Sequence, residues 1–427
     1  MLLFGTGIWA GLTAPAPARA AGFYLQEQSV KGWGRANSGE AADRGPDSLW
    51  WNPAAISGDT RPAISFGATA VFPSGRVEDR GTLIDRPVVP AVAVGGQAVM
   101  KDPIQAGVAP HFALSLPLSR QIALGLAVTS PYSFTTDYDP SGWQRYSAIR
   151  TRLVTLDVQP SIAFAPSEAI SLGVGLNLEY ADAFLSNALP NLAPGSPDAR
   201  LRLTGDGWDL GWSAGVQLRP APRVAIGLAY KSSVEHRLQG PVSISGLLGP
   251  LAARNVEART TARFSTPWQL ILGARAGVSR AVTVNAQIVR FGWSRFGTLD
   301  VGAPVSNAIA ENYRDTWSLA LGADAELNDR LTVRAGIQLD PTPTRDASRD
   351  PRVPDGDRVD YNIGASLRLG GAFTLDAAAA LTKPGASPIT RDEHFYAGTG
   401  AQTDILTEGR ARSQHVLVLA LGGRLTF

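Results

Sequence analysis

The sequence predicts an all-β membrane protein, an antiparallel transmembrane β-barrel of fourteen strands. Three observations support this prediction. Apolar and polar side chains alternate over most of the chain, short turns alternate with long polar loops, and the chain ends in an amphipathic strand with Phe427 as its last residue. The composition agrees, because only 18% of the 427 residues are charged, whereas about a quarter are charged in an ordinary soluble domain.

The first twenty residues have the features of an export signal. An apolar run over residues 2–14 is followed by an Ala-Arg-Ala tripeptide (18–20) that matches the small-x-small cleavage pattern, although no basic residue precedes the run. We expect residues 1–20 to be a signal peptide, cleaved after Ala20 or Ala21; the alternative is an apolar N-terminal helix. No later stretch reaches the roughly 18 uninterrupted apolar residues that a helical span needs.

The alternation is clearest in residues 209–219, 331–340 and 359–369. Each segment places Leu, Val, Ile, Ala or an aromatic residue on one face and Gly, Asp, Gln or Arg on the other. Such long strands suit a membrane barrel, whose apolar face meets lipid and whose polar face meets a filled or wet lumen. The barrel must close, because an open edge would leave backbone groups unpaired in hydrocarbon. The alternative is a soluble β-sandwich or a long β-repeat protein, but sandwich strands are usually shorter.

The turns give the number of strands. Six short breaks interrupt the pattern, at residues 119–121, 166–168, 220–222, 279–281, 328–330 and 370–371. Seven long polar segments lie between them, near 73–107, 131–150, 184–206, 237–260, 295–312, 342–358 and 384–412. These thirteen connections join fourteen strands within residues 62–427. An even number of strands with short periplasmic turns and long outer loops is the bacterial outer-membrane arrangement.

The last predicted strand, residues 413–427, places four leucines in step with Phe427. An amphipathic strand that ends in an aromatic residue resembles the assembly signal of outer-membrane barrels. The resemblance implies that the barrel-assembly machinery recognises Phe427.

Residues 21–61 do not alternate and contain small residues with several aromatics. Pro53 fixes its own backbone and restricts Asn52, which predicts a rigid turn. Physical reasoning leaves two alternatives open: a plug inside a barrel wide enough to need filling, or a flexible periplasmic leader.

Several motifs resemble the FadL/TodX family of outer-membrane transporters for long-chain fatty acids and other hydrophobic compounds. The N-terminal motifs are Gly22-Phe23-Tyr24-Leu25, the run from Gly32 to Ala42, and Asn52-Pro53-Ala54. Further motifs follow in order along the chain, and the most distinctive are Asp340-Pro341-Thr342-Pro343 and Val353-Pro354-Asp355-Gly356-Asp357-Arg358. The resemblance covers essentially all of the mature chain.

The resemblance implies a fourteen-stranded barrel with residues 21–61 as a small N-terminal hatch in its lumen. It also implies passive uptake: outer loops capture a hydrophobic ligand, an apolar site inside the barrel receives it, and it leaves sideways into the membrane through an opening at a kinked strand. The expected location is the outer membrane of a Gram-negative bacterium, and the expected form is a monomer in contact with outer-membrane lipid and lipopolysaccharide. A long-chain fatty acid and an aromatic hydrocarbon both remain open as cargo.

The resemblance also implies roles for individual residues of the hatch. Phe23 matches the aromatic residue that reaches into the internal site, and its alternative role is packing within the hatch. Asn52, Pro53 and Ala54 match the motif that fixes the hatch to the barrel wall.

Two further positions carry expectations in the barrel. Arg314 stands where the family has a basic residue able to bind a ligand carboxylate through a charge-assisted hydrogen bond; the alternative is an interior ion pair with Asp315 or another acid. The third strand, residues 122–130, is expected to hold the lateral opening, and Gly125 is a position that permits a kink.

Two other classes of protein fit less well. Residues 211–215 match the G-x-S-x-G pattern of hydrolases, but that motif needs a strand–turn–helix context and here it lies within a strand. The four histidines have no metal-ligand spacing, and Asp355 and Asp357 are expected to order a loop rather than to catalyse or to bind calcium. We therefore expect no enzymatic activity, no cofactor and no metal.

A general diffusion porin is the other alternative. A porin needs an open, charged pore and no plug, so the hatch-like segment argues against it. A nucleic-acid partner is not expected either, because no run of Lys or Arg alternates with aromatic residues.

Overall fold

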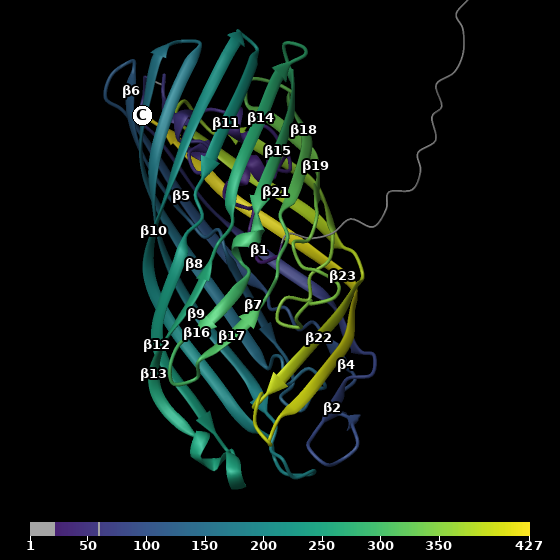
Figure 1. Ribbon diagram of the computed structural model, residues 1–427. Coiled ribbons are helices and arrows are strands. Elements are labelled where there is room, and N and C mark those ends of the chain that lie inside the picture. The colour runs from purple at the N-terminus through teal and green to yellow at the C-terminus, as the bar shows by residue number, and fades with distance from the viewer. Residues whose placement is uncertain (1–21, 59) are drawn as a thin grey trace, which may run out of the picture.

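The computed structural model describes residues 22–58 and 60–427, so the predicted signal peptide lies outside the described residues. The predicted fold is confirmed: fourteen antiparallel membrane-spanning segments close into a barrel (Figure 1). The closing pair joins β1 (Ala63–Asp79) to β23 (Thr403–Thr426) along its whole length, from Ala63 opposite Thr426 to Asp79 opposite Gly409. This pairing joins the first and last strands of the barrel, so neither leaves a free edge in lipid.

Between β1 and β23 the spanning strands follow chain order: β5 (Gly107–Pro117), β6 (Ile122–Thr129), β8 (Arg150–Ser167), β9 (Ile170–Leu189), β10 (Ala199–Ala221), β11 (Val224–Lys231) continued by β12 (Glu235–Ser245), β13 (Val256–Ser265) continued by β14 (Trp268–Gly277), β15 (Val282–Gly292), β18 (Thr316–Glu326), β19 (Leu331–Asp340), β20 (Arg358–Arg368) and β21 (Phe373–Pro384). Shorter strands lie at the long-loop end of the barrel: β2 (Leu83–Asp85), β3 (Val92–Ala93), β4 (Val99–Lys101), β7 (Ser133–Asp137), β16 (Thr298–Val301), β17 (Asn307–Ala310) and β22 (Ser387–Phe395). Two 3-10 turns, η4 (Gly249–Arg254) and η5 (Trp293–Arg295), lie in the long loops.

The six short turns lie where the sequence predicts them, but several strands are longer than predicted. The segment predicted as a loop at 237–260 is mostly strand, because β12 and β13 pair from Glu235 opposite Ser265 to Ile244 opposite Val256. Likewise β23 begins at Thr403 rather than at residue 413. Beyond the membrane the outward face of a strand meets water and no longer needs apolar side chains. The backbone pairing of the strands continues there, but the alternation of apolar and polar residues, from which the sequence predicts a strand, is lost.

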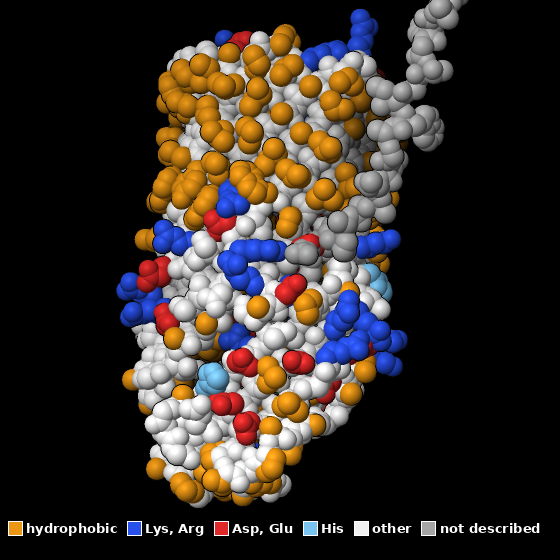
Figure 2. Space-filling view, turned by 45° about the vertical axis from the view of Figure 1, so that its right-hand side comes forward, with side chains coloured by type: hydrophobic (Ala, Val, Ile, Leu, Met, Phe, Trp, Pro, Cys, Tyr) orange, Lys and Arg blue, Asp and Glu red, His pale blue; other side chains and the backbone are white. Residues whose placement is uncertain are grey.

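Figure 2 shows a belt of apolar side chains over the short-turn half of the barrel on the face in view. Exposed members of this belt include Leu172, Val174, Leu176, Leu210, Leu319, Leu321, Ile363, Leu419 and Leu421. On its long-loop side, outward-facing aromatic residues follow one another around the wall: Trp212, Tyr230, Trp268, Trp317 and Tyr361. An apolar band bordered by an aromatic girdle is the outer surface of a transmembrane barrel. Among the described residues, no helix is long and apolar enough to cross a membrane.

The N-terminal residues 22–58, which we call the hatch, lie inside the barrel (Figure 1, purple). Their short helical turns are α1 (Val30–Trp33), η1 (Glu40–Ala42), η2 (Pro46–Ser48) and η3 (Pro53–Ile56), and together these turns contact strands on opposite sides of the wall. All four turns are buried. Of the two arrangements that physical reasoning left open, this segment therefore adopts the plug.

Glycines on the inner face of the wall make room for the hatch backbone. A Cβ atom on Gly227 would lie 1.8 Å from the carbonyl oxygen of Ala41, and one on Gly173 would lie 2.3 Å from the carbonyl carbon of Pro53. Contacts this short exclude any side chain at these positions. The Gly-rich inner faces in the sequence are thus surfaces against which the hatch packs.

Candidate functional site

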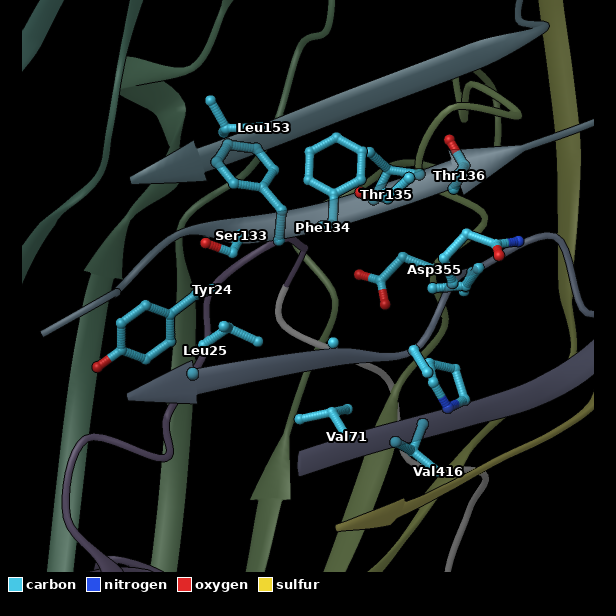
Figure 3. Close-up of a pocket in the computed structure, with 18 of the residues that line it drawn as sticks. Tyr24, Leu25, Val71, Ser133, Phe134, Thr135, Thr136, Leu153, Asp355 and Val416 are labelled. Atoms are coloured by element: carbon cyan, nitrogen blue, oxygen red, sulfur yellow. The ribbon is translucent and has the colours of Figure 1, made fainter. Parts of the chain in front are cut away.

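Two apolar cavities lie side by side at the N-terminal end of the hatch. The larger has a volume of about 470 Å³ and lies between the start of the hatch and strands β1, β5, β7 and β8 (Figure 3). The smaller, of about 70 Å³, lies among β8, β9, β10, β12, β13 and the loop before β18. The two cavities share five of their lining residues: Phe23, Phe134, Leu153, Arg352 and Val353.

Phe23 lies between the two cavities at the centre of an aromatic cluster. Its ring centroid is 5.6 Å from that of Phe134, 5.1 Å from that of Trp293 and 5.1 Å from that of Phe296. Backbone hydrogen bonds hold this end of the hatch to the third spanning strand: the Leu25 amide donates to the carbonyl of Pro131 at 2.8 Å. Aromatic pairs at such distances add about 0.5–1.5 kcal/mol beyond the burial of their area.

The larger cavity reaches a gap in the barrel wall. The third spanning strand is interrupted at residues 130–132, between the end of β6 and the start of β7. As a result β6 pairs with β5 only from Phe112 to Pro117, and residues 107–111 pair with β1 but not with β6. Residues from both edges of the gap, 107–110 and 133–134, line the cavity.

The register places this gap at the level of the apolar belt. Ala70 of β1 lies opposite Val108 on one side and opposite Leu419 on the other. Leu419 belongs to the belt, and Val108 is 68% exposed on the edge of the gap. The wall opening therefore faces lipid rather than water.

The interruption lies five residues beyond Gly125, the position predicted for a kink. Gly125 remains in the regular ladder, opposite Ser115 and Ser161. A Cβ atom there would lie 2.6 Å from Cδ1 of Ile56, so this glycine lies where hatch side chains pack against the wall. At the real break stands Pro131, which has no N–H to donate to a ladder.

Arg314 lies outside both cavities. Its Nε donates to the carbonyl of Thr342 at 3.3 Å, and its amide donates to the carbonyl of Pro343 at 2.9 Å. Asp315 pairs instead with Arg290, at 3.2 Å. Among the described residues Arg314 forms no ion pair with an acid, and its contacts tie the start of β18 to the loop after β19.

Arg352 is the basic residue that borders both cavities, and the sequence did not single it out. It is buried, its Nη1 lies 2.5 Å from Oδ2 of Asp350, and its Nε has no hydrogen-bond partner among the described residues. Asp350 is shared with Arg391, at 3.3 Å. The one available signal was its place directly before the Val353-Pro354-Asp355 motif.

Two buried acids on the loops flank the cavities. Burial, together with the nearby Asp350, raises the pKa of Glu311, which lines the smaller cavity, to about 7. Burial raises the pKa of Asp355 to about 6, and its carboxylate accepts hydrogen bonds from the Gly22 amide at 2.7 Å and the Thr342 hydroxyl at 2.6 Å. The Asp357 carboxylate accepts from the Thr342 amide at 3.1 Å. Asp355 and Asp357 thus order this loop, as the sequence predicts.

Asn52 connects the hatch to the barrel wall. Its Nδ2 donates to the carbonyl of Ala41 at 2.7 Å and to that of Val216 at 3.2 Å, while its Oδ1 accepts from the Ala54 amide at 3.0 Å. Pro53 opens the turn η3 directly after it.

A buried ionic network adds a second connection between hatch and wall. Arg35 pairs with Glu40 and Asp43 of the hatch and with Asp324 of β18. Asp324 also binds Arg334, at 2.7 Å.

Ser213, the serine of the G-x-S-x-G match, lies within β10 opposite Lys231 and Gly175. The neighbouring Trp212 is 51% exposed on the outer face. The strand–turn–helix context of a hydrolase nucleophile is therefore missing at this serine.

The family model described as outer membrane protein transport protein (OMPP1/FadL/TodX) matches residues 11–427. The chain belongs to this family. A long-chain fatty acid transport protein of Salmonella typhi is 27% identical over 400 residues, which are 84% of this chain and 86% of the relative. Outer membrane protein P1 of Haemophilus influenzae is 26% identical over 409 residues, 87% of this chain and 88% of the relative.

Solved structures of this OMPP1/FadL/TodX family share the fold. A Pseudomonas aeruginosa FadL homologue superposes with a TM-score of 0.81 at 24% identity, over 95% of this chain and 99% of the other. The Ralstonia pickettii toluene transporter TbuX superposes with a TM-score of 0.63 at 16% identity, over 93% and 98%. Family and barrel together locate the chain in the outer membrane of a Gram-negative bacterium.

Proposed function

We propose that this family member takes up long-chain fatty acids passively across the outer membrane. The outer loops capture the ligand, the smaller cavity passes it across Phe23 to the larger cavity, and it leaves through the gap at residues 130–132 into the membrane. The observation that supports this route most directly is the larger cavity, because it extends from Phe23 to a wall gap at the level of the lipid belt.

The driving force is the burial of apolar ligand surface. Each Å² of apolar surface removed from water contributes about 25 cal/mol, and a volume of about 470 Å³ lies within the usual range for small-molecule sites. A ligand that steps from one apolar cavity to the next and then into lipid needs no external energy source.

Arg352 is our proposed partner for the ligand carboxylate, in place of Arg314. Its side chain borders both cavities, and its buried Nε has no partner among the described residues. An arginine hydrogen bond to a carboxylate is stronger than a neutral one. We assign Arg314 the role of holding the loop at Thr342 and Pro343.

Neutral aromatic hydrocarbons are the second candidate cargo. The rings of Phe23, Phe134, Phe264, Phe296 and Tyr313 line the smaller cavity, and offset or edge-to-face contacts with them suit an aromatic ligand. Such a ligand would not need Arg352.

Three further roles belong to this proposal. Residues 1–20 direct export and are cleaved, Phe427 is recognised by the barrel-assembly machinery, and Asn52, Pro53 and Ala54 keep the hatch in the lumen. With the hatch fixed, the chain acts as a transporter with lateral release and neither as an enzyme nor as an open porin.

Uptake of radiolabelled oleate and toluene tests the route, in cells that lack their own transporter and express this chain. Gly107 stands at the edge of the gap with nothing within 4 Å of a Cβ atom, so Gly107→Trp places a bulky side chain there without a clash at the backbone. Gly371→Trp, in a short turn with equally open surroundings, is the matched control. We expect Gly107→Trp to lower oleate uptake severalfold while purified protein still binds oleate; unchanged uptake would rule out the gap as the exit.

A further inference from the structure

A row of basic side chains crosses the outer surface where β4, β1 and β23 run side by side. In the register of this sheet, Arg76 lies opposite Lys101 on one side and opposite Arg412 on the other, and Glu78 lies opposite Arg410. We call Arg76, Lys101, Arg410 and Arg412 the basic row.

The basic row faces outward. The alternate residues Val77, Met100 and Ala411 are buried together in an interior cluster, so their neighbours must point to the outside. All four members of the row are exposed.

The row lies beyond the end of the apolar belt on the long-loop side. On β23 the exposed Leu417, Leu419 and Leu421 belong to the belt, and Arg412 follows five residues past Leu417 toward the loops. Figure 2 shows Lys and Arg side chains gathered beyond this margin of the belt. This is the level of the lipid headgroups.

The positive charge of the row is only partly compensated. Glu78 pairs with Arg412 and, at 3.4 Å, with Arg80. Arg76, Lys101 and Arg410 have no acidic partner among residues 22–58 and 60–427 within ion-pair distance. Neighbouring antiparallel residues are about 4.5–5.5 Å apart, and like charges placed opposite one another repel.

We infer that the basic row binds the phosphate groups of lipid A, the membrane anchor of the lipopolysaccharide in the outer leaflet. Several uncompensated cations within one row fit a multiply charged, fixed anion better than a single carboxylate. Arg side chains bind phosphate bidentately and Lys binds it as a point charge. The row also adjoins the larger cavity, because Ser74, Gly75 and Asp102, next to Arg76 and Lys101, line that cavity. A lipid A molecule held there would stand beside the cavity of the proposed route.

This inference rests on the outer-membrane location and not on the nature of the cargo, so the lipid A inference and the proposed cargo can fail separately.

The test is native mass spectrometry of the full barrel in detergent with bisphosphorylated lipid A. The test variant combines Arg76→Gln, Lys101→Gln and Arg410→Gln, and it leaves Arg412 to neutralise Glu78. The control variant combines Arg120→Gln, Arg280→Gln and Arg330→Gln, which remove the same charge from exposed turns at the other end of the barrel.

We expect the test variant to bind lipid A at least tenfold more weakly and the control variant to bind it like the parent. The parent should also prefer bisphosphorylated to dephosphorylated lipid A, and millimolar inorganic phosphate should compete only weakly. The inference would be overturned if all three proteins bound lipid A equally, or if both variants lost lipid A affinity to the same extent. It would also be overturned if the parent bound bisphosphorylated and dephosphorylated lipid A equally. It would likewise be overturned if the test variant lost oleate and kept lipid A, because the row would then serve the cargo. Heat-dependent migration on gels verifies that each variant is folded.

Discussion

The ring of Phe23 lies 5.6 Å from the ring of Phe134, at an interplanar angle of 34°. The two residues are far apart in the sequence, one in the hatch and the other just past the break in the third spanning strand, and both line the two cavities. On the proposed route, a ligand that passes from the smaller cavity to the larger cavity must move past this pair.

Phe23→Ala should weaken the binding of a fluorescent long-chain fatty acid about tenfold, equivalent to about 1.4 kcal/mol, because the ligand loses its contact with the ring between the cavities. Fluorescence titration of the purified protein measures this change. Phe72→Ala is the matched control, since Phe72 is 46% exposed on the lipid-facing side. An unchanged affinity in Phe23→Ala would leave Phe23 with hatch packing as its only role.

Arg352→Gln should weaken oleate binding by about tenfold or more and leave toluene binding unchanged, because a hydrogen bond to a charged group contributes about 1.5–3 kcal/mol. Arg314→Gln removes the same charge outside both cavities and should affect neither ligand. Calorimetry of the two purified variants with both ligands measures these effects. If Arg314→Gln lost oleate selectively and Arg352→Gln did not, the assignment would be reversed.

The binding of a permanently charged alkyl sulfonate should weaken as the pH rises through 7. Glu311 has a pKa raised to about 7 by burial and by Asp350, so its carboxyl is neutral below this pH and negatively charged above it. Ionisation places a second negative charge in the smaller cavity and repels the sulfonate, whose own charge stays constant. Titrations from about pH 5.5 to 8.5 should show this decline in the parent and a much smaller one in Glu311→Gln, where Asp355, with a pKa raised to about 6 by burial, still titrates. An undiminished decline in Glu311→Gln would assign the effect to another group.

Gly227→Ala should displace the hatch from the barrel wall. The added Cβ would lie 1.8 Å from the carbonyl oxygen of Ala41, which also accepts hydrogen bonds from Asn52 and Gln217. We expect larger and noisier single-channel currents in planar bilayers than for the parent. Gly371→Ala, which has nothing within 4 Å of its Cβ position, should conduct like the parent. Parental conductance in a folded Gly227→Ala barrel would show that the hatch tolerates the displacement without opening a path.

Much of the barrel could be predicted from the sequence. Lipid outside and a packed lumen inside impose a period of two on every spanning strand, and that period survives in single segments such as residues 331–340. The six short turns were equally visible, because Pro, Gly, Asn and Ser punctuate them. The hatch motifs around Phe23 and Asn52 were found through their resemblance to a family, whereas physical reasoning alone left a plug and a leader open.

The tertiary structure decided the features that no local pattern records. The third spanning strand is interrupted at residues 130–132, where the Leu25 amide of the hatch donates to the carbonyl of Pro131, whereas Gly125 stays in the ladder and faces hatch side chains. Arg352 reaches the cavities and Arg314 does not, because this depends on how the loop between β19 and β20 folds over the barrel. A membrane requires alternating apolar and polar residues in every spanning strand, so the strands can be predicted from the sequence. A cavity is formed by residues that are distant in the sequence and that only closure of the barrel brings together.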